Sequence, residues 1–243
     1  MTGTASDVQA ALREVADAAD ALFLQGFFKT GPGQYGEGDV FIGVRVPATR
    51  AVAKRFPGLA LPEIDALLDS EAHEDRLAAL VILVARFEAA GRPRTRDDAL
   101  REQLTAAYLA AVRRGRVNNW DLVDSSAEFL LGEALLDRPR DILFELAASE
   151  ILWERRVAVL ATFAFIKRGD AATTLELAAL LLDDSEDLMH KAVGWMLREI
   201  GKRVDRGILV GFLDAHAGRM PRTMLSYATE HLDPAERARY RAV

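Results

Sequence analysis

A tryptophan and a carboxylate stand four residues apart in "NNWDLVDSSAEFLLGEAL", residues 118–135. The segment otherwise has a helical pattern, so we expect Trp120 and Asp124 on one face, one turn apart. The face of an indole ring attracts positive charge, and a carboxylate supplies a full counter-charge. The pair therefore suits the binding of a cation. The alternative is a packed tryptophan beside a solvated aspartate, which is the commoner arrangement for any such pair taken alone.

Two adjacent arginines interrupt the segment "ILWERRVAVLATFAFIK", residues 151–167, which is apolar on nearly all sides and is expected to be an inner helix. At least one of Arg155 and Arg156 must lie on a partly apolar face, where a guanidinium needs an anion. A protein carboxylate is the default partner. A phosphate is the alternative if the helix borders a nucleic-acid site.

A third feature is a stripe of cations that contains an aromatic residue. Along "EDLMHKAVGWMLREIGK", residues 186–202, the spacing i, i+4, i+7, i+11 places four residues on one helix face: Lys191, Trp195, Arg198 and Lys202. Such a stripe suits a sugar-phosphate backbone and an adjacent base. The alternative is a solvated face with one partly exposed tryptophan.

The elements that must position these residues are helices, because helical periodicity covers nearly the whole chain. Ser6 and Gln9 are expected to form a capping box, followed by a helix whose buried face runs from Leu12 to Phe23. An irregular Gly-rich stretch follows, and Pro47 then opens the next helix. No strand or hairpin pattern is found. The later helices are expected at residues 47–56, 61–69, 72–90, 97–114, 119–135, 139–148, 151–167, 171–182, 186–200, 205–215, 220–230 and 234–241.

Short helices in series indicate an all-α, HEAT-like helical-repeat solenoid, because none of them can bury its apolar face alone. The spacings from Trp120 to Arg156 and from Arg156 to Trp195 are both close to the roughly 40-residue period of such repeats. We expect one domain, with N-terminal helices and a Gly-rich loop over residues 1–46 and the repeat array over 47–243. Equivalent helices of the array should line a concave, locally basic groove.

Composition excludes several classes of chemistry. The chain has no cysteine, which excludes disulfides, thiolate metal sites and a cysteine nucleophile. Its net charge is -6, which disfavours a nucleic-acid partner, but the acidic excess lies before residue 150 and the remainder is balanced. The start of the chain has no leader pattern, and no apolar run is long enough to span a membrane. We expect a cytoplasmic monomer that does not bind membranes.

Other apparent motifs lack their structural context. The letters "GPGQYG", Gly31 to Gly36, match a dinucleotide fingerprint, but no strand precedes them. The four histidines are too scattered for a metal site, and Ser125 and Ser126 have no nearby histidine as a base. We expect no metal, no cofactor and no covalent serine chemistry.

Four segments together resemble the AlkD-type DNA alkylation-repair glycosylases, HEAT-like-repeat enzymes that remove alkylated purines. They are "YGEGDVFIGVRVPATRAVAK", "NNWDLVDSSA", "LWERRVAVL" and "KAVGWMLREIGK", in the family's order and spacing. The similarity covers roughly residues 20 to 230. Two features depart from the family: Asn119 stands where a second aromatic residue is frequent, and the pI is acidic.

The resemblance implies roles for individual residues. Trp120, Asp124 and Trp195 would lie at the lesion, with Asp124 as the catalytic carboxylate, and Arg156 would hold the DNA backbone nearby. Further DNA contacts are implied, or in the case of Lys191 expected from the basic stripe, at Tyr35, Arg50, Lys54, Lys191, Arg198, Lys202 and Arg222.

The implied activity is hydrolysis of the N-glycosidic bond of cationic N3- or N7-alkylated purines in double-stranded DNA. The base would stay largely stacked, and no lysine is placed for lyase chemistry. Two alternatives stay open. One is a related enzyme specialised for bulky adducts, as in self-resistance to a DNA-alkylating product. The other is a HEAT-repeat scaffold that binds DNA or protein without catalysis, against which Asp124 argues, since a carboxylate repels phosphates.

Overall fold

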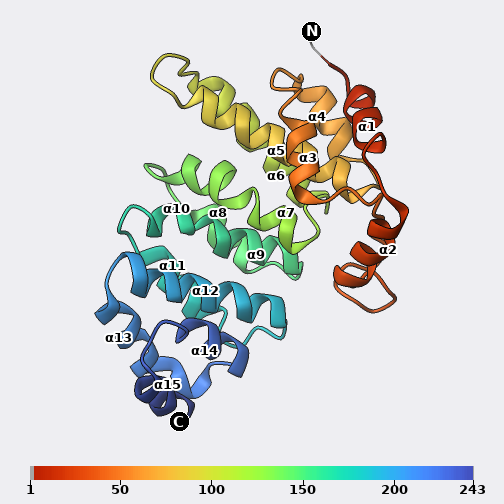
Figure 1. The fold of residues 1–243 in the computed structure, drawn as a ribbon. Coiled ribbons are helices and arrows are strands. Elements are labelled where there is room, and N and C mark those ends of the chain that lie inside the picture. The colour runs from red at the N-terminus through yellow and green to blue at the C-terminus, as the bar shows by residue number, and fades with distance from the viewer. Residues whose placement is uncertain (1–2, 243) are drawn as a thin grey trace. The chain divides into compact units, whose positions relative to one another are not determined.

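The structure is a computed structural model and describes residues 3–242, in which every regular element is a helix (Figure 1). The only strand-like pairing within this range is an isolated bridge between Val40 and Ala72. The expectation of an all-α chain is therefore confirmed. The chain forms two compact units, the first ending at Leu130 and the second beginning at Leu131.

Helix α5 is the centre of the first unit, and α1, α3, α4, α6 and α7 all pack against it. Its apolar residues are buried on several sides, among them Leu77, Leu80 and Leu83. A helix that is apolar nearly all round must be covered on all sides, which explains its central place. The helices of this unit are α1 (Ala5–Arg13), α2 (Ala18–Phe27), α3 (Val46–Ala53), α4 (Leu61–Leu68), α5 (His73–Ala90), α6 (Asp98–Arg113) and α7 (Trp120–Asp124).

The prediction of one N-terminal helix with a buried face from Leu12 to Phe23 is wrong, because the chain forms two helices there. The capping box is made by Thr4 and Asp7, not by Ser6 and Gln9. The first helix ends at Arg13, and Asp17 caps a second one by accepting hydrogen bonds from the amides of Ala19 and Asp20. Helix α2 consequently buries none of its residues, and Phe23 is 53% exposed.

The predicted irregular stretch is present and is held by one carboxylate. Glu74, at the start of α5, accepts hydrogen bonds from the amides of Ile42, Gly43 and Val44. Gly43 has a φ of 86°, and a Cβ atom there would lie 1.8 Å from the carbonyl oxygen of Asp17. Only glycine fits this position.

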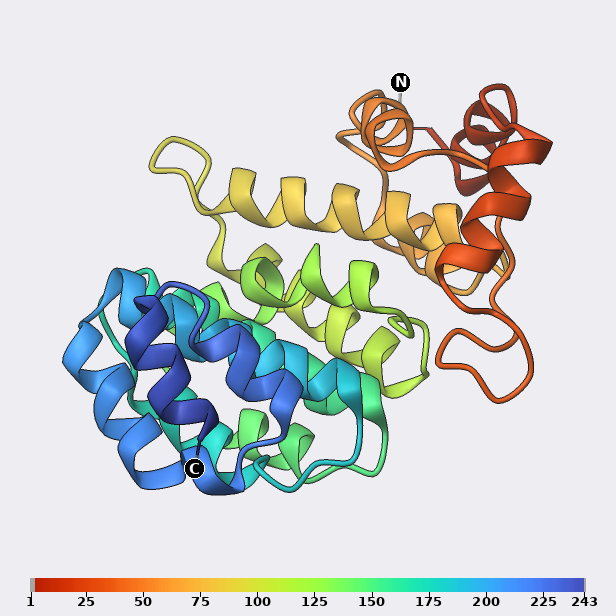
Figure 2. The same ribbon diagram turned by 60° about the horizontal axis from the view of Figure 1, so that its bottom comes forward.

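Helix α12 is the centre of the second unit, packed against α9, α10, α11, α13 and α14. Figure 2 shows α12 and α14 in the blue part of the chain. The elements of this unit, after a π-helical turn at Glu128–Gly132, are a 3-10 turn at Glu133–Leu135, α8 (Asp141–Ala147), α9 (Leu152–Ala161), α10 (Phe163–Ile166), α11 (Ala172–Leu180), α12 (Asp187–Arg203), α13 (Arg206–His216), a 3-10 turn at Ala217–Arg219, α14 (Arg222–Ala228) and α15 (Pro234–Arg241).

Two predicted helices are interrupted. The one expected over residues 119–135 leaves α-geometry after Asp124, and the one over 151–167 is divided at Thr162. The other predicted helices are present, with ends shifted by a few residues. Neighbouring helices pack in pairs, such as α4 with α5 and α8 with α9, as a helical-repeat fold requires. No helix within residues 3–242 is long and apolar enough to cross a membrane.

Candidate functional site

The predicted pair of Trp120 and Asp124 occupies the two ends of the five-residue helix α7. The side-chain oxygen of Asn119 caps this helix by accepting a hydrogen bond from the amide of Trp120 at 2.9 Å. Both Trp120 and Asp124 are half-buried, so each keeps some contact with solvent. Their separation by one helical turn is as predicted from the sequence.

The Trp120 ring is one end of an aromatic stack. It lies 5.2 Å from the ring of Phe28, nearly parallel to it, and Phe28 in turn stacks on Phe41 at 4.9 Å. The rings of Phe27 and Trp120 meet in a T-shaped arrangement, with their centroids 6.1 Å apart. Because Phe28 and Phe41 are themselves buried, the stack fixes one face of the indole ring.

A buried ion cluster lies beside this stack. The two ring nitrogens of His73 are each 2.8 Å from a carboxylate oxygen, one of Asp39 and the other of Asp121. Arg76 is a second cation on Asp39. Burial alone would lower the pKa of His73, but the two carboxylates outweigh it and raise this pKa to about 9. His73 is therefore an imidazolium at neutral pH and donates from both nitrogens.

The cluster distinguishes the two aspartates of α7. Asp121 is only 7% exposed and is neutralised by His73, whereas Asp124 is half-buried at the other end of the helix. Asp124 lies near the buried hydroxyl of Tyr108, whose pKa is raised by burial and further by the charge of Asp124. Asp124 is thus the more exposed of the two carboxylates of α7.

Sequence reasoning missed the groups that surround α7. The sequence patterns indicate no role for Asp39 or Phe28, and they test His73 only as a possible metal ligand. One available signal was the charged run "HEDR", residues 73–76, at the start of an otherwise apolar helix. All four of its residues are buried, and each has a partner outside the helix.

The predicted DNA contacts of the first unit lie on its surface. Arg50 and Lys54 are exposed one turn apart on α3, and neither forms an ion pair with any residue between 3 and 242. Tyr35 is half-buried in the Gly-rich loop, with its hydroxyl 3.5 Å from the carbonyl oxygen of Phe27 and the Lys29 ammonium 5.9 Å from its ring.

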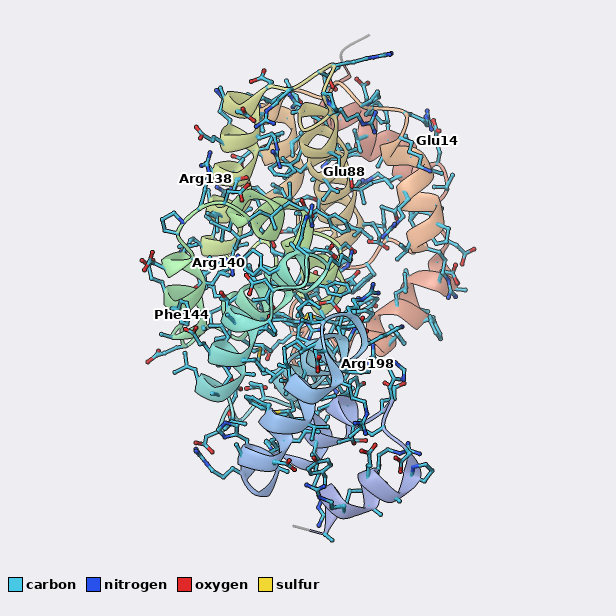
Figure 3. The ribbon with its side chains drawn as sticks, turned by 90° about the vertical axis from the view of Figure 1, so that its left-hand side faces the viewer. Glu14, Glu88, Arg138, Arg140, Phe144 and Arg198 are labelled. Carbon is cyan, nitrogen blue, oxygen red and sulfur yellow. The ribbon has the colours of Figure 1, made fainter. Side chains whose placement is uncertain are left out.

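The basic stripe of the second unit does lie on one helix, α12, but two of its cations form salt bridges with carboxylates. Arg198 contacts both Glu230 and Glu199, and Figure 3 labels it in this part of the chain. Lys191 pairs with Asp187 at 2.7 Å. Trp195 is half-buried, with its ring 6.0 Å from that of Phe163.

Two other predicted cations of this unit differ from Arg198 and Lys191. Lys202 on α12 and Arg222 at the start of α14 are exposed, and no carboxylate within the described part of the chain pairs with either.

The two adjacent arginines of α9 both find partners within their own unit. Arg155 forms a salt bridge with Asp184 at 2.7 Å and donates to the carbonyls of Ser149 and Glu150. Arg156 is 4% exposed and donates to the carbonyl of Leu188 at 2.5 Å. Arg155 therefore has a carboxylate partner of the kind expected for a guanidinium in this segment.

Residues 3–242 contain no cluster of His, Asp or Glu side chains arranged to hold a metal ion. Ser126 is buried and donates a hydrogen bond to the carbonyl of Leu122 at 2.6 Å, which is a structural role. The arrangement is that of a helical-repeat protein with an aromatic and carboxylate site on a short, firmly held helix.

Comparison with known proteins places this arrangement in a family. The family model described as DNA alkylation repair enzyme matches residues 8–232, so the chain belongs to the DNA alkylation repair enzyme family. The resemblance inferred from the four sequence segments is thereby confirmed.

The structural comparison agrees on the fold. The chain is similar to a predicted DNA alkylation repair enzyme from Enterococcus faecalis, with a TM-score of 0.71 and 18% identity over 90% of this chain and 97% of that one. No curated protein matches the sequence. Family membership gives the chain a role in the repair of alkylated DNA.

Proposed function

We propose that this protein is a monofunctional DNA glycosylase that hydrolyses the N-glycosidic bond of cationic N3- and N7-alkylated purines in double-stranded DNA. The observation that carries the proposal is α7, where the half-buried Trp120 and Asp124 stand one turn apart. His73 neutralises the other carboxylate of this helix. Asp124 is the more exposed carboxylate of the helix, and it lies one turn from the anchored Trp120 ring.

This pair suits a substrate that becomes more cationic at its sugar as it reacts. Alkylation at N3 or N7 gives the purine a positive charge and weakens its bond to C1′. Cleavage then moves positive charge onto the deoxyribose. A carboxylate held beside C1′ stabilises that oxocarbenium-like state and orients a water molecule for attack, as in glycoside hydrolysis.

The aromatic residues contribute the second part of the proposal. The Trp120 ring attracts the cationic nucleotide through its π face. Because the leaving base is already charged, deep base flipping into an acid-lined pocket is not required. The exposed cations Arg50, Lys54, Lys202 and Arg222 are proposed to hold DNA phosphates.

The test is release of free base from a duplex that contains N7-methylguanine. We expect wild type to release the base and Asp124→Asn to lose activity by about 10²- to 10³-fold, the usual effect of removing an electrostatic stabiliser. Duplex binding should persist or strengthen in the variant, since a negative charge is removed. Asp98→Asn, at an exposed carboxylate on α6 of the same unit, is the matched control and should behave as wild type.

Two outcomes would contradict the proposal. Binding of the duplex without base release by wild type would favour a non-catalytic scaffold. Efficient release of a neutral base, such as uracil or 1,N6-ethenoadenine, would contradict the mechanism, because it requires a leaving base that is already cationic.

One observation favours a bulky-adduct specialist as a second candidate. Helix α2 exposes Leu22, Phe23 and Phe27, and the ring of Phe27 makes a T-shaped contact with that of Trp120. An apolar adduct could pack on this face. A substrate panel decides between the two: the specialist should release bulky adducts and leave N7-methylguanine in place.

A further inference from the structure

A clamp of buried polar groups holds α7 on both sides of Trp120. We infer that His73, Asp121 and Asn119 are positioning residues that fix the Trp120 ring and, through the same helical turn, the Asp124 carboxylate. The expected effect on catalysis rests on the proposed glycosylase function. The expected effect on the position of the Trp120 ring does not.

The two neighbours of Trp120 in the sequence are tied to one ion pair. Asn119 is fully buried, accepts the amide of Trp120 with its oxygen and donates to Asp39 at 3.2 Å with its nitrogen. Asp121 accepts the Leu122 amide with one oxygen and contacts His73 with the other. Asp39 and His73 are themselves joined at 2.8 Å. The start of α7 is therefore held from both sides by a single cluster.

The same cluster also supports the ring of Trp120. The His73 imidazolium lies over Phe41 at 4.4 Å and near Phe28 at 5.2 Å, and Phe28 carries the stacked indole. A cation held against aromatic faces attracts them. Backbone and side chain of Trp120 thus depend on His73 through separate contacts.

Helix α7 cannot hold this geometry by itself. A single five-residue helical turn is unstable without tertiary contacts, because nucleating a helix costs more than one turn returns. After Ser126 the chain passes into a π-helical turn, so α7 is not extended and stabilised by further α-helical turns. Buried ion clusters contribute little net stability compared with apolar packing, so their best-attested use is to specify one geometry.

The geometric test follows Trp120 directly in the full-length protein labelled with 5-fluorotryptophan. The chain has three tryptophans, and replacing each by Phe assigns its ¹⁹F resonance. We expect His73→Gln to shift or broaden the Trp120 resonance and to leave Trp153 and Trp195 unchanged. Asp121→Asn keeps an acceptor for His73 but removes the charge, so it should give a smaller shift in the same resonance.

The matched control is Asp75→Asn, which removes another buried charge from the same first turn of α5. Asp75 pairs with Arg13 and, within residues 3–242, forms no hydrogen bond or ion pair with α7. The control should leave the Trp120 resonance in place. If it moves that resonance as far as His73→Gln does, general loosening of α5 explains the effect and the inference is wrong.

The catalytic test is single-turnover base release at saturating enzyme. His73→Gln should lower the release rate by about 10²-fold, the effect of a misplacement of about 1 Å, with little change in duplex Kd. A normal rate in a variant whose Trp120 resonance has moved would overturn the catalytic part. An unmoved resonance in both variants would overturn the clamp. If wild type releases no base, the proposed function fails, and the ¹⁹F spectra still decide the clamp.

If His73→Gln does not fold, Asp121→Asn carries both tests. It is the milder change, because asparagine has nearly the same shape as aspartate and its side-chain oxygen can still accept a hydrogen bond from His73. A Trp120 resonance identical to that of wild type in this variant would then overturn the inference.

Discussion

At the scale of single residues, chemical type alone does not assign a role. Asp121 and Asp124 belong to the same short helix, yet one is neutralised by a buried imidazolium and the other is half-buried near Tyr108. The environment of a carboxylate sets whether its charge is already compensated. Asp121 is compensated by His73, and the more exposed Asp124 is the carboxylate that we propose meets a developing cation.

The buried His73 should make stability depend on pH. Its pKa is raised from 6.5 to about 9 in the folded protein, because the carboxylates of Asp121 and Asp39 outweigh the effect of burial. The folded chain therefore binds this proton more tightly than the unfolded chain. The resulting stability is complete below pH 6.5 and is lost as the pH rises through about 9.

We expect the free energy of unfolding to fall by about 3 kcal/mol across that window, since one unit of pKa shift corresponds to about 1.4 kcal/mol. Urea unfolding at a series of pH values measures it. The slope should be much flatter in His73→Gln. An equal slope in the variant would assign the pH dependence to other groups.

At the scale of elements, short segments that carry site residues are held by long buried helices. Helix α5 supplies the cluster that holds α7, and α12 carries Trp195 while packing against α14. The approach of α12 and α14 depends on Gly194. A Cβ atom at that position would lie 2.5 Å from the carbonyl oxygen of Met224 and 2.6 Å from the Cβ of Tyr227.

Gly194→Ala should therefore destabilise the protein by about 1–3 kcal/mol, the usual cost of overpacking, despite the better helix propensity of alanine. The matched control is Gly211→Ala on α13, where an added Cβ meets no atom within 4 Å. The control should be neutral or stabilising by up to about 1 kcal/mol. Thermal unfolding compares the two, and equal shifts in Tm would contradict the close contact.

At the scale of the whole molecule, DNA must be bound by a protein with a net charge of -6. Affinity for phosphates then depends on which cations lack carboxylate partners and not on the total. Lys202 is exposed and unpaired within the described residues, whereas Arg198 contacts Glu230 and Glu199.

Two substitutions on this surface should have opposite effects on duplex binding. Lys202→Ala should weaken binding and lower the slope of log K against log salt by about 1, as expected for one lost phosphate contact. Glu230→Gln should strengthen binding and raise the slope, because it removes a surface negative charge and one of the two carboxylates that pair with Arg198. Titrations of undamaged duplex over a range of salt concentrations measure both. Slopes unchanged in both variants would place the DNA elsewhere.

Local patterns predicted most of the helices, because apolar periodicity reports one buried face directly. They failed near residues 14–17, where Asp17 starts a new helix and the apolar stripe of the sequence continues into exposed residues such as Leu22. They failed again after Asp124, where the chain turns into π-helical geometry. In both places a cap or a packing contact, and not periodicity, sets the backbone conformation.

The sequence by itself determined the all-α class, the absence of cysteine chemistry, the family and the one-turn spacing of Trp120 and Asp124. These depend on composition or on neighbours within a few residues. Only the tertiary structure decided that Asp121 is neutralised, that Arg198 is occupied and that His73 supports Trp120. Arg198 and Glu230 are 32 positions apart in the sequence, and His73 and Asp121 are 48 positions apart. No local pattern encodes such pairs, because they form only when the helices pack.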